Sequence, residues 1–135
     1  MSDVGAAYRP YRDRCAITGV GSTAFTKRSG KTELSLATEA ALAAIADAGL
    51  EPADIDGLVR CDSDRVLHND LALALGVRNL DYYGQNGPGG VAPCGMIGQA
   101  VAAVLAGQAT NVIVYRSLNG RSGRRWGQAD AGASQ

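Results

Sequence analysis

Cys94 is the side chain of this sequence that is best placed for nucleophilic chemistry. It follows the segment Gly87-Pro-Gly-Gly90 and lies in the first turn of a helical pattern that runs from Pro93 to Leu105. The free N–H groups and the dipole at a helix N-terminus stabilise a thiolate, and a thiolate attacks acyl groups. The alternative is a small thiol that packs the helix, because many unpaired cysteines serve only as buried apolar groups. These residues alone leave both interpretations open.

A basic aromatic cluster is the second candidate site. Arg121, Arg124, Arg125 and Trp126 follow the predicted strand 111–116. Ligands of open α/β sheets bind beyond the carboxyl ends of the strands, and guanidinium groups pair with phosphates. The cluster therefore predicts a contact with a phosphate or with coenzyme A. The alternative is a solvated surface loop or a partner contact, which is the commoner role of a charged cluster.

No group of residues predicts a metal ion or a nucleotide cofactor. His68 is the only histidine, and the three cysteines stand far apart without a C-x-x-C pair. Gly19-Val-Gly-Ser-Thr-Ala24 matches a dinucleotide fingerprint in letters, but the next helical pattern starts only at Glu33. Ser29-Gly-Lys-Thr32 resembles the end of a phosphate-binding loop, yet Phe25 stands where its first glycine is required.

The elements that must position these residues alternate between short β-branched runs and helical patterns. We predict four strands, at Cys15–Val20, Asp56–Arg60, Leu80–Tyr83 and Asn111–Arg116, and a glycine-rich loop at Gly84–Gly90. Between them we predict a helix at Glu33–Ala48, capped by Thr32 and ended by Gly49, and a short helix at Leu71–Leu75, capped by Asn69 or Asp70 and ended by Gly76. A third helix is predicted at Pro93–Leu105, followed by Gly107. Such alternation predicts parallel strands with right-handed crossovers, hence a layered α/β domain. No strand pattern follows Tyr115, so we expect the architecture to be incomplete.

Composition narrows the class of protein. The chain has 135 residues, of which 46% are apolar and 19% charged, as in one globular domain. Its 13 basic and 13 acidic residues balance, which does not favour nucleic acid or an anionic membrane as a partner. We find no secretory signal pattern and no apolar run of membrane-spanning length. Together with the unpaired cysteines, these features predict a cytoplasmic protein.

Three segments are similar to the opening of the thiolase superfamily, in its lipid-transfer, sterol-carrier-protein-type branch. They are Cys15–Phe25, Glu33–Leu50 and Asp54–Leu58, which match the family's first strand and turn, its first helix, and the lead into its second strand. The resemblance implies the N-terminal half of a thiolase-like α/β fold, with sheet and helices in layers. It implies a partial domain at 15–128, an N-terminal extension at 1–14, and a disordered tail at 129–135.

The resemblance also bears on Cys94. Counted back from Gly107, the family's nucleophile falls near Val91, and Cys94 lies about one helical turn later. The segment Val114–Gln128 resembles the thiolase-like aldolases of bacterial steroid side-chain degradation, which lack that nucleophile. This implies a lyase that splits a branched β-hydroxyacyl-CoA into a steroid ketone and propionyl-CoA. The coenzyme A thioester is then a substrate, and no bound cofactor is implied.

Partners and missing parts follow from the same resemblance. It implies a small partner with an OB-like domain of the DUF35 type, and a homodimer whose contact residues are Leu80, Tyr82, Tyr83, Gln85 and Asn86. The family's acid and base groups belong to its second half, so no catalytic residue is assigned here and the chain alone is expected to be inactive. Two alternatives stay open. One is an acyl-CoA thiolase or acyltransferase with Cys94 as nucleophile, and the other is a non-catalytic docking subunit or truncated product.

Overall fold

The computed structural model describes residues 12–87, 89–120 and 122. In chain order its elements are helix α2 (Glu33–Asp47), 3-10 helix η2 (Pro52–Asp54), strand β1 (Gly57–Cys61), helix α3 (His68–Leu75), strand β2 (Tyr82–Asn86), 3-10 helix η3 (Gly89–Val91), helix α4 (Ala92–Leu105) and strand β3 (Val112–Tyr115). Most of the predicted extension 1–14 and all of the predicted tail 129–135 lie outside the described residues.

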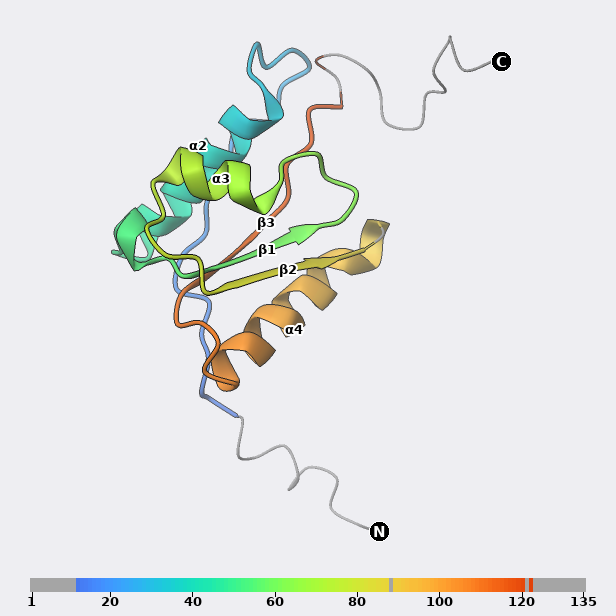
Figure 1. Ribbon diagram of the computed structural model, residues 1–135. Helices are drawn as coiled ribbons and strands as arrows, with labels where there is room; N and C mark the ends of the chain where they lie inside the picture. Colours follow the sequence, from blue (N-terminus) through green and yellow to red (C-terminus); the bar gives the residue numbers. More distant parts are fainter. Residues whose placement is uncertain (1–11, 88, 121, 123–135) are drawn as a thin grey trace.

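The three described strands form a parallel sheet in the order β2-β1-β3. Gly57 at the start of β1 is opposite Tyr82 on one side and Val112 on the other. Helices α2 and α3 cover one face of this sheet and α4 covers the other (Figure 1). The predicted layered α/β architecture with parallel strands is therefore confirmed.

Each face of the central strand supports its own apolar cluster. Leu58 packs with Ala41 and Ile45 of α2 and with residues of α3, while Val59 on the opposite face packs against Met96 of α4. All five residues of β1 are buried, as expected for a strand with helices on both faces. This central strand fixes the positions of the loops at the carboxyl edge of the sheet.

The sequence signals predict both ends of α2 correctly but the start of α3 incorrectly. The Thr32 side chain accepts a hydrogen bond from Ser35 N at 3.0 Å, and Gly49 has a φ of 68°, so the predicted cap and stop of α2 are confirmed. The predicted cap of α3 at Asn69 or Asp70 is wrong. The helix begins at His68 with Leu67 as its N-cap, because the Leu67 carbonyl already accepts the first helical bond, from Leu71 N.

The predicted strand at Cys15–Val20 does not pair with any strand of the described residues. The segment is extended and lies against α2, where Gly21 permits the contact: a Cβ at Gly21 would stand 2.0 Å from the Ala40 carbonyl oxygen. Its one hydrogen bond to the rest of the described chain runs from Val20 N to an Asp47 carboxylate oxygen at 2.9 Å. The segment does not form a strand because no strand of the described residues pairs with it.

The predicted start and end of the third strand also need correction. β2 runs from Tyr82 to Asn86, so three residues that we assigned to a glycine-rich loop belong to the strand. Gly84 is buried opposite Val59, and a Cβ there would come within 2.6 Å of the Gln99 amide nitrogen on α4. Gly84 thus allows α4 to approach the sheet closely and does not mark a turn.

Candidate functional site

The loops that follow β1, β2 and β3 meet at one edge of the sheet because the three strands are parallel. The N-terminal end of α4 reaches the same edge: a Cβ on Gly95 would lie 2.6 Å from the side-chain oxygen of Asn86, the last residue of β2. In open α/β sheets this carboxyl edge is the usual place for a ligand.

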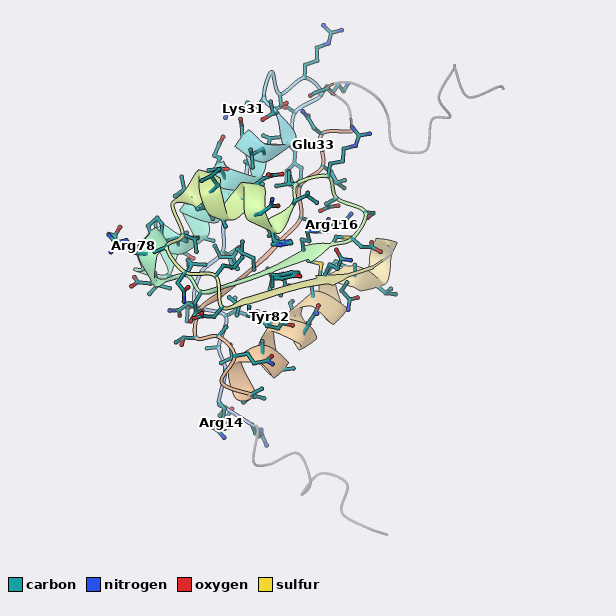
Figure 2. All side chains as sticks on the ribbon, viewed as in Figure 1. Arg14, Lys31, Glu33, Arg78, Tyr82 and Arg116 are labelled. Carbon is teal, nitrogen blue, oxygen red and sulfur yellow. The ribbon has the colours of Figure 1, made fainter. Side chains whose placement is uncertain are left out.

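Asp64 is the buried anion of this edge. Its side chain is fully buried and accepts hydrogen bonds from Arg116 Nη2 at 3.1 Å and from Ser117 N at 2.9 Å. Arg116 lies at the end of β3 (Figure 2), and the hydrogen bond to Asp64 raises the pKa of its guanidinium. The pair ties the loop after β1 to the residues that follow β3.

Arg60 is a buried cation whose hydrogen bonds in the described part of the chain go to carbonyl and amide oxygens. Its Nη1 donates to the carbonyls of Cys61 at 3.1 Å and Asp64 at 2.8 Å, and its Nη2 donates to Gln85 Oε1 at 2.8 Å. Its Nε has no hydrogen-bond partner within the described part of the chain. Arg60 therefore holds the loop after β1 and the end of β2 in place through both of its Nη groups.

Tyr115 is a buried phenol at the end of β3. Its hydroxyl donates to the Val66 carbonyl at 3.0 Å. Burial raises the pKa of Tyr115 to about 12, although nearby Arg60 acts in the opposite direction. A phenol with so high a pKa, whose proton is already donated in a hydrogen bond, is a poor general acid. This agrees with assigning Tyr115 no catalytic role.

Cys94 is exposed on the first turn of α4. Val91, near which the family's nucleophile was placed, is the N-cap of α4, and its side chain is 73% exposed. Cys94 lines neither of two cavities in the described part of the chain, of about 610 and 330 Å³. The sulfur is therefore accessible at the candidate edge without opening into either cavity.

The basic cluster Arg121, Arg124, Arg125 and Trp126 lies outside the described residues. Its neighbour Ser122 is described, and the Ser122 hydroxyl accepts a hydrogen bond from Ser29 N at 2.7 Å. Asn119 reinforces this contact by donating to the Lys31 carbonyl at 2.7 Å. The loop that leads into the cluster is therefore held against the segment before α2.

The predicted dimer contacts lie on or next to β2, which is an edge strand of the described sheet. Tyr83 is 61% exposed and stacks on His68 at 4.0 Å between ring centroids. Gln85 is exposed, whereas Leu80, Tyr82 and Asn86 are half-buried. Leu80 and Tyr82 also pack against the two core clusters, so their side chains serve the core of this chain as well.

The chain is similar to curated proteins and to solved structures. It is 50% identical over 117 residues to a steroid side-chain-cleaving aldolase of Thermomonospora curvata, and 44% identical over 115 residues to the 17-hydroxy-3-oxo-4-pregnene-20-carboxyl-CoA lyase of Mycobacterium tuberculosis. Among solved structures, the Ltp2-ChsH2(DUF35) aldolase matches 84% of the chain at 49% identity with a TM-score of 0.79. A monomeric SCP2-thiolase-like protein of Mycobacterium smegmatis matches 73% at 25% identity, with a TM-score of 0.59.

This chain is thiolase-like. The predicted resemblance and the incomplete thiolase-like α/β fold are thereby confirmed. The matched segments make up 87% and 85% of the thiolase-like chain but only 30% of each curated relative. It covers 30% and 22% of the two solved chains. No family model matches the sequence.

Two further findings concern only the described residues. None of their helices is long and apolar enough to cross a membrane. They also contain no group of three or more His, Cys, Asp or Glu side chains arranged to hold a metal ion.

The buried network of Arg60, Asp64 and Arg116 was missed in the sequence. One signal was available: Arg60 ends an otherwise apolar strand segment, Gly57-Leu-Val-Arg60. A charge in such a run must find partners, since burying an unpaired charge costs several kcal/mol. The side-chain partners are distant in sequence: Arg60 and Gln85 stand 25 residues apart, and Arg116 and Asp64 stand 52 residues apart, so no local pattern reveals these pairs.

Proposed function

We propose that the chain is part of a lyase that cleaves a branched β-hydroxyacyl-CoA by a retro-aldol reaction, in the degradation of steroid or other lipid side chains. The 50% identity over 117 residues to a steroid side-chain-cleaving aldolase is the observation that carries this proposal. The TM-score of 0.79 to a second aldolase supports it. Because the chain spans about 30% of these proteins, we expect no turnover from the 135 residues alone.

A retro-aldol step needs few groups. A base removes the hydroxyl proton, the bond between the β- and α-carbons breaks, and the hydroxyl carbon becomes a ketone. The electron pair goes to the thioester as an enolate, which donors stabilise until it takes up a proton and forms propionyl-CoA. No covalent acyl-enzyme forms, so the reaction does not need a cysteine.

Two polar groups of the carboxyl edge, Asp64 and Tyr115, are not free to act as that base. Asp64 is fully buried and bonded to Arg116, and Tyr115 donates its proton to a backbone carbonyl. From the resemblance to the family, whose acid and base groups belong to its second half, we infer that the acid and base lie in the part of the protein that this chain does not match. On this proposal the described residues form the scaffold that supports them.

Coenzyme A is the substrate component that this chain is proposed to contact, through Arg121, Arg124, Arg125 and Trp126. The anchoring of Ser122 and Asn119 next to the segment before α2 supports a fixed position for the start of this loop. Arg116 is already committed to Asp64, which leaves the phosphate-binding role to the arginines that follow.

Partners and location are part of the same proposal. A homodimer would form across the free edge of β2, with Tyr83 and Gln85 as its exposed residues. A partner of the DUF35 type is supported by the matched structure, which is named as an aldolase complex with such a protein. We propose a cytoplasmic location because the three cysteines form no closely spaced pair in the sequence.

A second candidate is acyl transfer with Cys94 as nucleophile. Its support is the exposure of Cys94 in the first turn of α4, where the helix dipole favours a thiolate. A third candidate is a non-catalytic docking subunit, which would share the fold and the DUF35 partner but turn over no substrate in any assembly.

One chimera tests these candidates together. Residues 15–128 replace the matching stretch of the T. curvata aldolase, and the chimera is assayed with a DUF35 partner and 17-hydroxy-3-oxo-4-pregnene-20-carboxyl-CoA. We expect release of the steroid ketone and propionyl-CoA, with Cys94→Ala as active as the parent chimera. Loss of activity in Cys94→Ala together with an acyl-enzyme burst would support acyl transfer. If neither the folded parent chimera nor its Cys94→Ala variant releases product, the result would support the docking role. Turnover by the 135 residues with the partner would refute the expected inactivity.

A further inference from the structure

Two segments that are far apart in the sequence are joined by side-chain hydrogen bonds. Ser29 N donates to the Ser122 hydroxyl at 2.7 Å, and the Ser29 hydroxyl donates to Asn119 Oδ1 at 3.0 Å. Asn119 Nδ2 donates in turn to the Lys31 carbonyl at 2.7 Å. The residues that follow β3 are therefore fixed next to the segment that leads into α2.

Ser117 shows where in the fold these two segments meet. It follows β3, and its hydroxyl donates at 2.7 Å to the carbonyl of Glu33, the first residue of α2. Its N–H donates at 2.9 Å to Asp64 in the loop after β1. The joined segments therefore lie at the carboxyl edge of the sheet, where ligands of open α/β sheets bind.

Positive charge is concentrated in these two segments. Residues 27–31 contain Lys27, Arg28 and Lys31, residues 116–125 contain four arginines, and neither stretch contains an acidic residue. Seven of the 13 basic residues thus belong to two short stretches of a chain whose net charge is zero. Bringing like charges together costs Coulomb energy unless an anion lies beside them. The arrangement therefore indicates a ligand with several negative charges.

Lys27 and Arg28 are the members of the first segment that are available to such a ligand. Both are exposed, and in the part of the chain that the structure describes neither forms an ion pair. Lys31 and Arg116, by contrast, are each paired with a carboxylate. Ser29 holds the backbone next to Arg28 in place, so less ordering remains to be done when a ligand binds.

We propose that Lys27 and Arg28 bind the phosphates of the coenzyme A nucleotide, together with the basic cluster that follows Asn119. This inference rests on the proposed function, in which the basic cluster contacts coenzyme A, and it extends that site to residues before α2. Ammonium and guanidinium groups both form charge-assisted hydrogen bonds with phosphate oxygens. The thioester substrate of the proposed lyase itself supplies the polyanion that the two segments require.

A compact anion is favoured over nucleic acid or an anionic membrane. Outside the two segments the chain holds six basic residues and all 13 of its acidic residues. An extended polyanion would meet this negative remainder, whereas a nucleotide is small enough to stay within the basic region.

Two thioesters of the same acyl group test the proposal in the chimera with its DUF35 partner. One is 17-hydroxy-3-oxo-4-pregnene-20-carboxyl-CoA, and the other is the corresponding pantetheine thioester, which lacks the nucleotide. Lys27→Ala and Arg28→Ala should each raise KM for the coenzyme A thioester by about tenfold, as expected for the loss of one charged hydrogen bond. The kcat values and KM for the pantetheine thioester should not follow this change.

Arg78→Ala is the matched control. Arg78 is also exposed, but it precedes β2, and Figure 2 shows it and Lys31 at opposite ends of α2. This variant should change KM for neither thioester. Arg28→Lys keeps the charge and should recover part of the affinity that Arg28→Ala loses.

Three outcomes would overturn the inference. One is an active chimera in which neither Lys27→Ala nor Arg28→Ala changes KM for the coenzyme A thioester, a result that leaves the proposed function intact. The second is an equal rise of KM for both thioesters, which would show a general disturbance of the fold. The third is loss of the DUF35 protein from the purified variants with KM unchanged at saturating partner, which would assign the two side chains to that partner.

A binding measurement separates this inference from the proposed function. If the folded chimera turns over neither thioester, the proposed function fails, and calorimetry with 3′-phospho-ADP then decides the inference. The Kd should rise about tenfold in Arg28→Ala and stay unchanged in Arg78→Ala. Equal Kd values in the parent and in Arg28→Ala would overturn the assignment.

Discussion

The Asp64–Arg116 pair yields the sharpest prediction because its two members are buried unequally. The Asp64 side chain is fully buried, while that of Arg116 is 31% exposed. Removing Arg116 leaves the buried Asp64 carboxylate without its charged partner. Within the described part of the chain, it then keeps the hydrogen bond from Ser117 N. Removing the charge of Asp64 leaves a guanidinium that water can reach. We therefore predict that Arg116→Met destabilises the chain more than Asp64→Asn does.

The expected magnitude is larger for Arg116→Met than for Asp64→Asn. Leaving a buried ion without its partner costs about 3 to 5 kcal/mol, which we expect for Arg116→Met. Asp64→Asn keeps the side-chain volume and an acceptor for Ser117 N, so its cost is that of one charged hydrogen bond, about 1.5 to 3 kcal/mol, reduced by hydration of Arg116. In a chain of this size, each kcal/mol lowers the melting temperature by roughly 4 °C.

Urea denaturation followed by circular dichroism measures both costs. The double variant completes a thermodynamic cycle, in which we expect the cost of the pair to fall short of the sum of the single costs by about 1 kcal/mol or more. Lys31→Met provides a control, since Lys31 pairs with Glu39 on the surface and should cost less than about 1 kcal/mol. An Asp64→Asn variant less stable than Arg116→Met would refute the assignment of the carboxylate as the buried member.

Three further outcomes are expected. Gly21→Ala should destabilise the chain by about 1 to 3 kcal/mol in urea because its Cβ meets backbone of α2, whereas Gly98→Ala, in open space on α4, should stabilise it by about 0.5 to 1 kcal/mol. Iodoacetamide at neutral pH should label exposed Cys94 long before buried Cys61, as read by peptide mass spectrometry, and equal rates would contradict the burial of Cys61. The pKa of Tyr115 is raised to about 12, so the unfolded chain loses this proton first and stability should fall as the pH rises from about 10 to 12. Tyr115→Phe should remove that part of the loss in pH-dependent urea titrations.

Elements with local signals were predictable, and those that depend on distant partners were not. Helix α2 lies between Thr32 and Gly49 as predicted, because a side-chain cap and a left-handed glycine act within a few residues. The extended conformation of residues 15–20 follows from local preference, but pairing needs a neighbouring strand that the described chain lacks. Gly84 was assigned to a loop because the close approach of Gln99 cannot be read from sequence spacing.

The candidate site was predictable only in outline. The alternation of strands and helices places the ends of β1, β2 and β3 at one edge, and Cys94 lies at the start of a helix there as expected. The network that orders this edge was invisible, since Arg116 and Asp64 stand 52 residues apart and a single sequence gives no sign of which charges become buried. Thr32 and Gly49 act through adjacent residues, whereas this network forms only when the sheet assembles.

The same network separates the scaffold from the chemistry. Arg60 spends its Nη groups on backbone carbonyls and Gln85, Arg116 is bound to Asp64, and Tyr115 is bound to a carbonyl, so the best-ordered polar groups at the edge satisfy one another. Groups that satisfy one another keep the three loops rigid, but they have little capacity to accept a substrate proton. These groups therefore support the edge, and on the proposed function we expect the reactive base to be another residue of the protein.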